Sequence, residues 1–262
     1  MRSPAERPTP DIPTPDVVVE PDADRLARAV AEALVARLAA AQAVRGSASV
    51  VLTGGGIGIA VLRQVAALAA EPVRERVDWS AVDVWWGDER FVPADDAERN
   101  DKQARDALLG RVGVPAGRVH AMPASDGPVA VPEDAAAEYA GQLAAAAGAD
   151  GDVPAFDVLL LGMGPEGHVG SIFPDSPAAR AEGSVVAVRD CPKPPPTRIS
   201  LTFPAINRAT EVWLLVSGSA KAPAVAQALG GADPLEVPAA GVHGTVATRW
   251  LLDADAASQL PA

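Results

Sequence analysis

The chain has 262 residues, of which 48% are hydrophobic and 21% charged, and its formal net charge is −12. This length and apolar content suffice for one large α/β domain or two small ones, and we expect a single domain. The negative charge argues against nucleic acid and anionic membranes as partners. No apolar run reaches the about twenty residues that a membrane-spanning helix needs, and no apolar signal region follows the first charge. We therefore expect a cytoplasmic protein that acts on a small molecule.

Cysteine and proline usage add two expectations. Cys191 is the only cysteine, which excludes an internal disulfide and a thiolate metal cluster and fits a reducing compartment. Residues 1–16 contain five prolines among several charges, which predicts a disordered tail. The folded domain is then expected to span residues 17–262.

The apolar pattern predicts strands that alternate with helices. A short strand at 17–19 leads to Asp22 and Asp24, which are placed to cap a helix that ends at Gly46. Further strands are predicted at 50–53, 82–86, 156–161, 199–203, 212–217 and 246–251, and helices at 57–70, 100–109, 132–147 and 220–229. Such a pattern is typical of a three-layer α/β/α, Rossmann-like fold with a mostly parallel sheet. Ligands of these folds bind at the carboxyl ends of the strands.

The first strand end with unusual residues is Thr53-Gly54-Gly55-Gly56. Glycines between a strand and a helix let backbone N–H groups turn toward an anion at the helix N-terminus, which suits a phosphate. A plain tight turn is the alternative, because glycine motifs are common.

The second strand end continues into Gly87-Asp88-Glu89-Arg90. A solvated loop would explain three successive charges. Opposite a phosphate loop, however, Arg90 is a candidate clamp or a stabiliser of developing oxyanion charge.

The third strand end runs from Gly162 to His168 and contains G-x-G-x-x-G. We reject a dinucleotide-binding interpretation, because Pro174 and Pro177 follow and leave no room for the long helix that it requires. His168 lies on this flexible loop, two residues after Glu166. The carboxylate could orient the imidazole, which leaves the other ring nitrogen free to take a proton from water.

The fourth strand end carries Ser217-Gly218-Ser219-Ala220-Lys221. At the start of a helix the positive charge of Lys221 opposes the helix dipole, and a bound phosphate would remove that conflict. Arg198, at the start of the strand predicted at 199–203, is a further candidate. Each could equally be an ordinary surface cation.

Several familiar motifs are missing from the sequence: G-x-S-x-G, the Walker G-K-[ST] and H-E-x-x-H. Covalent serine hydrolysis, nucleotide phosphoryl transfer and zinc proteolysis therefore lack their usual signatures. We expect no cofactor and no metal. A base, an orienting acid and several cations indicate water attack on an activated carbonyl of an anionic substrate.

From residue 17 to the end, these segments together resemble the 6-phosphogluconolactonases, which belong to a NagB/RpiA-like fold group that includes the glucosamine-6-phosphate isomerases. The resemblance implies hydrolysis of a phosphorylated sugar lactone in the pentose phosphate pathway, with His168 as general base and Arg90, Arg198 and Lys221 around the phosphate and lactone. We assign His168, Glu166 and Arg90 to the catalytic group. Thr53, Gly54, Gly55 and Asp88 are assigned to substrate binding, and we expect a monomer or a weak homodimer.

The chain departs from the family pattern at three places. Glu166 replaces the usual aspartate, Thr53 the usual serine, and Gly56 and Gly58 a Ser-Thr-Pro continuation. Two other functions stay open. Glucosamine-6-phosphate deaminases share the fold, but they carry Asp-Glu-Tyr where this chain has Asp88-Glu89-Arg90. A non-catalytic sugar-phosphate sensor is the second, although no basic DNA-binding segment accompanies the domain.

Overall fold

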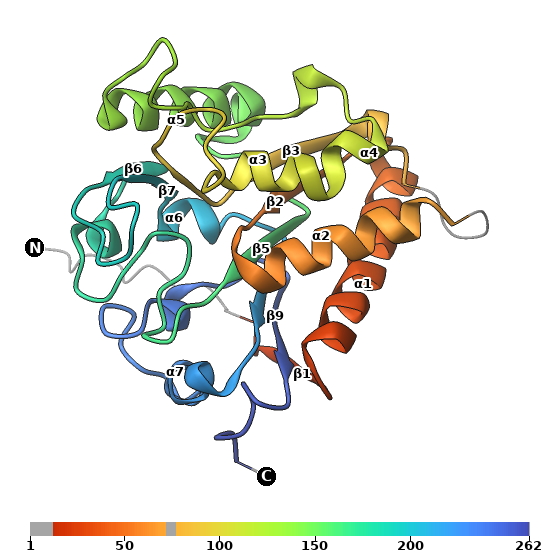
Figure 1. Ribbon diagram of the computed structural model, residues 1–262, viewed down its shortest axis with the longest axis vertical. Helices are drawn as coiled ribbons and strands as arrows, with labels where there is room; N and C mark the ends of the chain where they lie inside the picture. The colour runs from red at the N-terminus through yellow and green to blue at the C-terminus, as the bar shows by residue number, and fades with distance from the viewer. Residues whose placement is uncertain (1–12, 72–76, 262) are drawn as a thin grey trace, which may run out of the picture.

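The computed structural model describes residues 13–71 and 77–261 of the chain. Its centre is a six-stranded sheet in the order β1-β9-β8-β5-β2-β3, with every neighbouring pair parallel (Figure 1). The strands of this sheet are β1 (Asp16–Glu20), β2 (Ala48–Leu52), β3 (Val82–Trp86), β5 (Val158–Gly162), β8 (Glu211–Val216) and β9 (Ala247–Asp253). The parallel sheet that the sequence predicts is confirmed. Most of the predicted tail lies outside the described residues, and Asp16 already belongs to β1.

Helices flank the sheet on both faces. They are α1 (Ala23–Arg45), α2 (Gly55–Ala69), α3 (Asn100–Ala104), α4 (Gly110–Val112), α5 (Pro132–Ala147), α6 (Phe203–Ile206) and α7 (Ala222–Leu229). Helices α1 and α2 pack together on one face, whereas α5, α6 and α7 lie on the opposite side (Figure 1). As predicted, Asp22 caps α1, accepting a hydrogen bond of 2.8 Å from the backbone N–H of Arg25, and Gly46 ends it.

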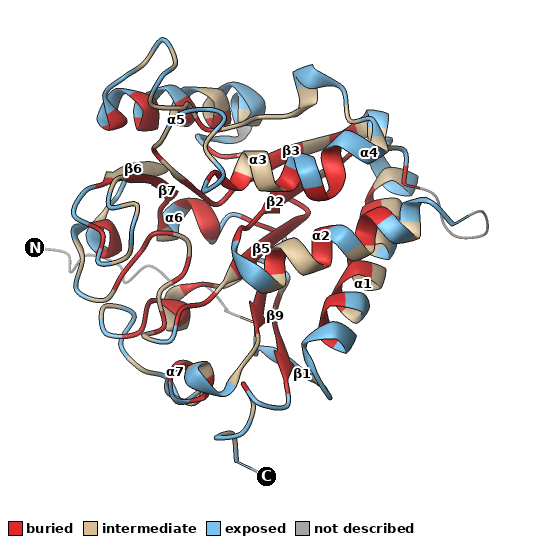
Figure 2. Ribbon diagram, in the orientation of Figure 1, coloured by how far each residue is buried: buried red, intermediate tan, exposed pale blue. Residues whose placement is uncertain are grey.

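The core lies on the two central strands. Every residue of β8 and residues 158–161 of β5 are buried, as Figure 2 shows for the middle of the sheet. Strands buried on both faces need apolar side chains at consecutive positions, which explains the run Val158-Leu159-Leu160-Leu161. This continuity is the reason that these strands were predictable from the sequence.

Two elements differ from the sequence predictions. Residues 199–203 were expected in the main sheet, but β7 (Arg198–Leu201) lies instead in a small antiparallel sheet between β4 (Asp88–Arg90) and β6 (Val185–Val188). The charged block after β3 is therefore largely a paired strand rather than a loop. The helix predicted at 100–109 is α3 followed by a π-helical turn at Arg105–Leu109.

The chain order brings four strand ends together. After β2 the chain adds β3 on one side, and it later returns to place β5 and then β8 on the other. The carboxyl ends of β8, β5, β2 and β3 consequently lie next to one another on one edge of the sheet. The position between β2 and β5, where the order reverses, is where such folds bind ligands.

We predict that Leu160→Ala lowers the free energy of unfolding by ~2–5 kcal/mol, because it leaves a cavity in the central strand β5. Leu160 is 1% exposed. Val44→Ala on α1, where the side chain is 82% exposed, should change stability by less than about 0.5 kcal/mol. Urea denaturation followed by fluorescence measures both, and equal effects would contradict the assignment of β5 to the core.

Candidate active site

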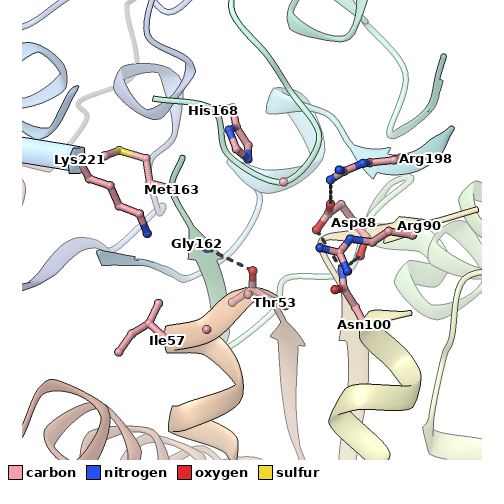
Figure 3. A pocket seen from close by; sticks show the side chains of 14 residues that line it. Thr53, Ile57, Asp88, Arg90, Asn100, Gly162, Met163, His168, Arg198 and Lys221 are labelled. Atoms are coloured by element: carbon pink, nitrogen blue, oxygen red, sulfur yellow. Dashed lines mark hydrogen bonds and ion pairs between the residues drawn. The ribbon is translucent and has the colours of Figure 1, made fainter. Parts of the chain in front are cut away.

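A pocket lies at the four strand ends (Figure 3). It is lined by the turn at residues 53–57, by Asp88 and Arg90 of β4, by parts of the loop at residues 162–170, and by Arg198 and Lys221. Every site residue predicted from the sequence lines this pocket except Glu166, whose Oε1 atom lies 3.2 Å from Nδ1 of His168. The structure thus brings these residues together, while their roles stay predictions.

The turn after β2 is tied to both neighbouring elements. The hydroxyl of Thr53 accepts a hydrogen bond of 3.2 Å from the backbone N–H of Gly162, which joins the ends of β2 and β5. Gly54 lies directly against Asn100, and a Cβ atom at Gly54 would stand 1.9 Å from the Oδ1 atom of Asn100. Only glycine fits at this position. The backbone of the turn therefore forms the floor of the pocket at the N-terminus of α2.

Glu89 holds the N-terminus of α3, which lies next to this turn. Its carboxylate is fully buried and accepts backbone hydrogen bonds from Arg90, Asn100 and Asp101 at 2.7–2.9 Å. Two of these donors are the first N–H groups of α3, so Glu89 caps that helix from a distant strand. Arg99 lies 3.6 Å away and is also buried. Burial raises the pKa of Glu89 to about 7, against the lowering effect of Arg99 and the backbone donors.

Asp88 and Arg198 face each other across the small sheet. The Oδ2 atom of Asp88 accepts a hydrogen bond of 2.8 Å from the Ser171 hydroxyl and lies 4.0 Å from Nη1 of Arg198. Arg198 uses its other donors on backbone carbonyls of residues 193–195. Its guanidinium is thus fixed in place, with Nη1 left facing Asp88 and the pocket (Figure 3).

Arg90 and Lys221 add positive charge at opposite sides of the pocket (Figure 3). Nη1 of Arg90 donates to the carbonyl of Glu98, and its buried Nε has no partner among the described residues. Lys221 ends the short 3₁₀ turn before α7. Burial lowers the pKa of Lys221, Asp253 raises it, and Lys193 lowers it further. A bound anion would stabilise both cations.

His168 projects into the pocket from the loop after β5. Its ring stacks on Phe173 at a centroid distance of 4.4 Å, and its Nδ1 atom lies 3.2 Å from Oε1 of Glu166. Gly164 lies directly beneath the pair: a Cβ atom there would stand 2.0 Å from Nδ1 of His168. The longer side chain of Glu166 still reaches the ring. Burial lowers the pKa of His168 more than the neighbouring Glu166 carboxylate raises it, and Lys193 also lowers it.

Sequence reasoning missed two polar residues of this region. Asn100 lines the pocket and donates a hydrogen bond of 2.8 Å to the carbonyl of Asp88. Lys193 lies 2.9 Å from the carboxylate of Glu166. The scarcity of lysine was a usable signal for Lys193, since the chain has only Lys102, Lys193 and Lys221. Nothing in the local sequence singles out Asn100.

No group of three or more His, Cys, Asp or Glu side chains among the described residues is arranged to hold a metal ion. None of the helices in the described part of the chain is long and apolar enough to cross a membrane. Cys191 is buried and unpaired.

Comparison with known proteins agrees with this architecture. A family model described as glucosamine-6-phosphate isomerases/6-phosphogluconolactonase matches residues 21–250. The 6-phosphogluconolactonase of Mycobacterium tuberculosis is 56% identical over 94% of this chain and 98% of its own. A solved 6-phosphogluconolactonase of Trypanosoma brucei superposes with a TM-score of 0.78 at 29% identity, covering 94% of this chain and 99% of the other.

A solved monomeric glucosamine-6-phosphate deaminase of the NagB superfamily shares the fold, with a TM-score of 0.76 at 20% identity and coverage of 93% and 99%. The chain therefore shares the α/β fold of these solved proteins. More narrowly, the chain belongs to the glucosamine-6-phosphate isomerase/6-phosphogluconolactonase family, within which the relatives compared here at high identity are 6-phosphogluconolactonases.

We predict that Gly54→Ala displaces Asn100, weakens the hydrogen bond from Asn100 to Asp88 and destabilises the protein by ~1–3 kcal/mol. Gly56→Ala is the matched control, because a Cβ atom at Gly56 meets nothing within 4 Å. It should leave stability unchanged or raise it by up to about 1 kcal/mol, since alanine favours the helix. Thermal unfolding of both variants tests this, and a stable Gly54→Ala would show that the contact yields easily.

Glu89 should also make stability depend on pH. The pKa of Glu89 is about 7 in the folded protein, against an ordinary value of 4.5, so the unfolded chain releases this proton first as pH rises. Stability contributed by Glu89 is therefore present below about pH 4.5 and declines toward about pH 7. Urea denaturation across this range should show wild type losing stability relative to Glu89→Gln, which cannot titrate. The opposite trend would show that the buried carboxylate ionises readily.

Proposed function

We propose that this enzyme hydrolyses 6-phospho-D-glucono-1,5-lactone to 6-phospho-D-gluconate, by attack of a water molecule that His168 deprotonates. The observation that carries the proposal is the pairing of His168 with Glu166 at the mouth of a pocket that three cations line. The high identity to 6-phosphogluconolactonases supports the choice of substrate.

The phosphate of the substrate would bind at the glycine turn. The turn at residues 53–56 ends at the N-terminus of the 15-residue helix α2, where backbone N–H groups and the helix dipole favour an anion. Lys221 and Arg90 lie on either side of the same pocket and supply positive charge. The chain as a whole has a net charge of −12, but the pocket is lined by three cations and only one carboxylate, that of Asp88. This local positive charge suits a dianionic phosphate.

Three features suit His168 to the role of base. The Glu166 carboxylate accepts a hydrogen bond from Nδ1–H, which fixes the tautomer and leaves the Nε2 lone pair free. Burial lowers the pKa of His168, so the ring is neutral at physiological pH despite the nearby carboxylate. Stacking on Phe173 fixes the ring plane. A neutral, oriented imidazole is what general-base catalysis requires.

Nε2 of His168 takes a proton from water while the water oxygen bonds to the lactone carbonyl carbon, and the carbonyl oxygen becomes an oxyanion. Cationic side chains of the pocket stabilise that charge. Among them, Arg198 lies 4.0 Å from Asp88 and over the ring of Phe173, on which His168 stacks. Collapse of this intermediate breaks the bond between the carbonyl carbon and the ring oxygen. The imidazolium returns its proton to that oxygen, which becomes a hydroxyl group. The carboxylic acid so formed loses its proton to solvent and leaves as a carboxylate.

The chemistry requires no partner beyond this small molecule. We propose that the enzyme works as a monomer or a weak homodimer in the cytoplasm, where the unpaired Cys191 would remain reduced.

We predict that wild type accelerates hydrolysis of freshly generated 6-phosphogluconolactone well above the spontaneous rate, without added metal. His168→Ala should lower kcat by ~10²–10⁴-fold, the usual contribution of a general base, with little change in KM. Acid release and formation of 6-phosphogluconate are the measurements.

Either of two results would overturn the proposal. Full turnover by His168→Ala would remove the assigned base. No acceleration by wild type, together with ammonia release from glucosamine 6-phosphate, would instead favour the deaminase alternative.

A further inference from the structure

Lys193 contacts the catalytic pair from outside the pocket. Its Nζ atom lies 2.9 Å from both carboxylate oxygens of Glu166 and 3.5 Å from Nδ1 of His168. Among the described residues, only Lys193 and His168 lie within salt-bridge distance of Glu166. The ammonium therefore holds the carboxylate from one side while the imidazole meets it from the other.

The backbone around Lys193 is itself held in place. Arg198 donates to three consecutive carbonyls of this loop: to Lys193 at 3.0 Å, to Pro194 at 3.3 Å and to Pro195 at 3.1 Å. The backbone N–H of Cys191 closes the loop by donating to the carbonyl of Pro196 at 2.9 Å. The Arg198 side chain is only 6% exposed, so these hydrogen bonds are shielded from water. Lys193 is consequently presented to Glu166 by a fixed scaffold.

We propose that Lys193 is a positioning residue for the hydrolysis, which holds the Glu166 carboxylate ionised and aligned behind His168 and is itself placed by Arg198. This inference rests on the proposed function, because it assumes that His168 acts as the base. Arg198 then has a second role, to hold the loop that carries Lys193, since its Nε and Nη2 atoms donate to that loop and only Nη1 faces the pocket.

Electrostatics supports the same role. Burial raises the pKa of Glu166, but the hydrogen bond from Lys193, a backbone hydrogen bond and the charges of His168 and Lys193 together lower it below its ordinary value. For His168, burial lowers the pKa, Glu166 raises it, Lys193 lowers it and Asp88 raises it. Farther round the pocket, Arg90, Arg198 and Lys221 are also charged. Removal of the Lys193 charge should therefore make His168 easier to protonate, which disables the base.

The test compares Lys193→Met with Lys193→Arg and Lys102→Met. Methionine keeps the length of the side chain but removes the charge, whereas arginine retains it. Lys102 pairs with Asp106 at 3.1 Å on the surface and provides a matched loss of one positive charge outside the site. The pH dependence of kcat and KM for lactone hydrolysis is measured for all three variants and for wild type.

For Lys193→Met we expect kcat to fall by about tenfold or more at neutral pH, a smaller loss than removal of the base itself causes. KM should change little, and the acid limb of the profile should move to higher pH. Lys193→Arg should restore much of the activity and the position of the acid limb. Lys102→Met should match wild type throughout.

A second measurement does not depend on turnover. The chain has only three histidines, His120, His168 and His243, so long-range ¹H–¹⁵N spectra can follow each ring, with His168→Ala identifying the signal. We expect the His168 ring to protonate at higher pH in Lys193→Met than in wild type. Unchanged titration of His168 and an unchanged acid limb in Lys193→Met would overturn the inference.

The two proposals fail in different ways. If wild type does not hydrolyse the lactone, or His168→Ala retains turnover, the proposed function falls, whatever the spectra of the Lys193 variants show. If wild type is active and His168→Ala inactive but Lys193→Met behaves like wild type, only the role of Lys193 is refuted.

Discussion

The site depends on one constraint, the parallel alignment of β8, β5, β2 and β3 with their carboxyl ends side by side. Each of these strands ends at the same edge of the sheet, so residues separated by more than a hundred positions meet in one pocket. The hydrogen bond between Thr53 and Gly162 ties two of these ends together. Because the strands are buried on both faces, the sheet cannot shift without loss of core packing, and the pocket inherits that rigidity.

Much of this arrangement was predictable from the sequence. Continuous apolar runs such as Val158–Leu161 indicate buried parallel strands, and the glycine-rich turn after such a strand indicated either an anion site or a plain tight turn. His168 was identifiable because its loop follows a strand of this kind. The pairing of His168 with Glu166 was predictable because the two residues are only two positions apart on the same loop.

The rest was hidden because it depends on long-range partners. Residues 88–90 look like a solvated loop, and nothing local shows that they pair with β7 or that Glu89 is buried as the cap of α3. Arg198 was recognisable as a cation, but its use as an anchor for the loop at residues 193–195 depends on carbonyl groups, which sequence patterns do not reveal. Lys193 lies 27 residues from the carboxylate that it contacts. Such contacts are fixed by tertiary structure alone.

The three consecutive prolines at 194–196 limit the conformational entropy of the loop that carries Lys193. Each proline ring fixes φ, so this segment has few conformations to lose even in the unfolded chain. The cost of ordering the segment beside His168 and Glu166 is therefore small and falls on folding rather than on the binding of a ligand. Substrate binding need not freeze a mobile loop, and more of the binding free energy remains for the transition state.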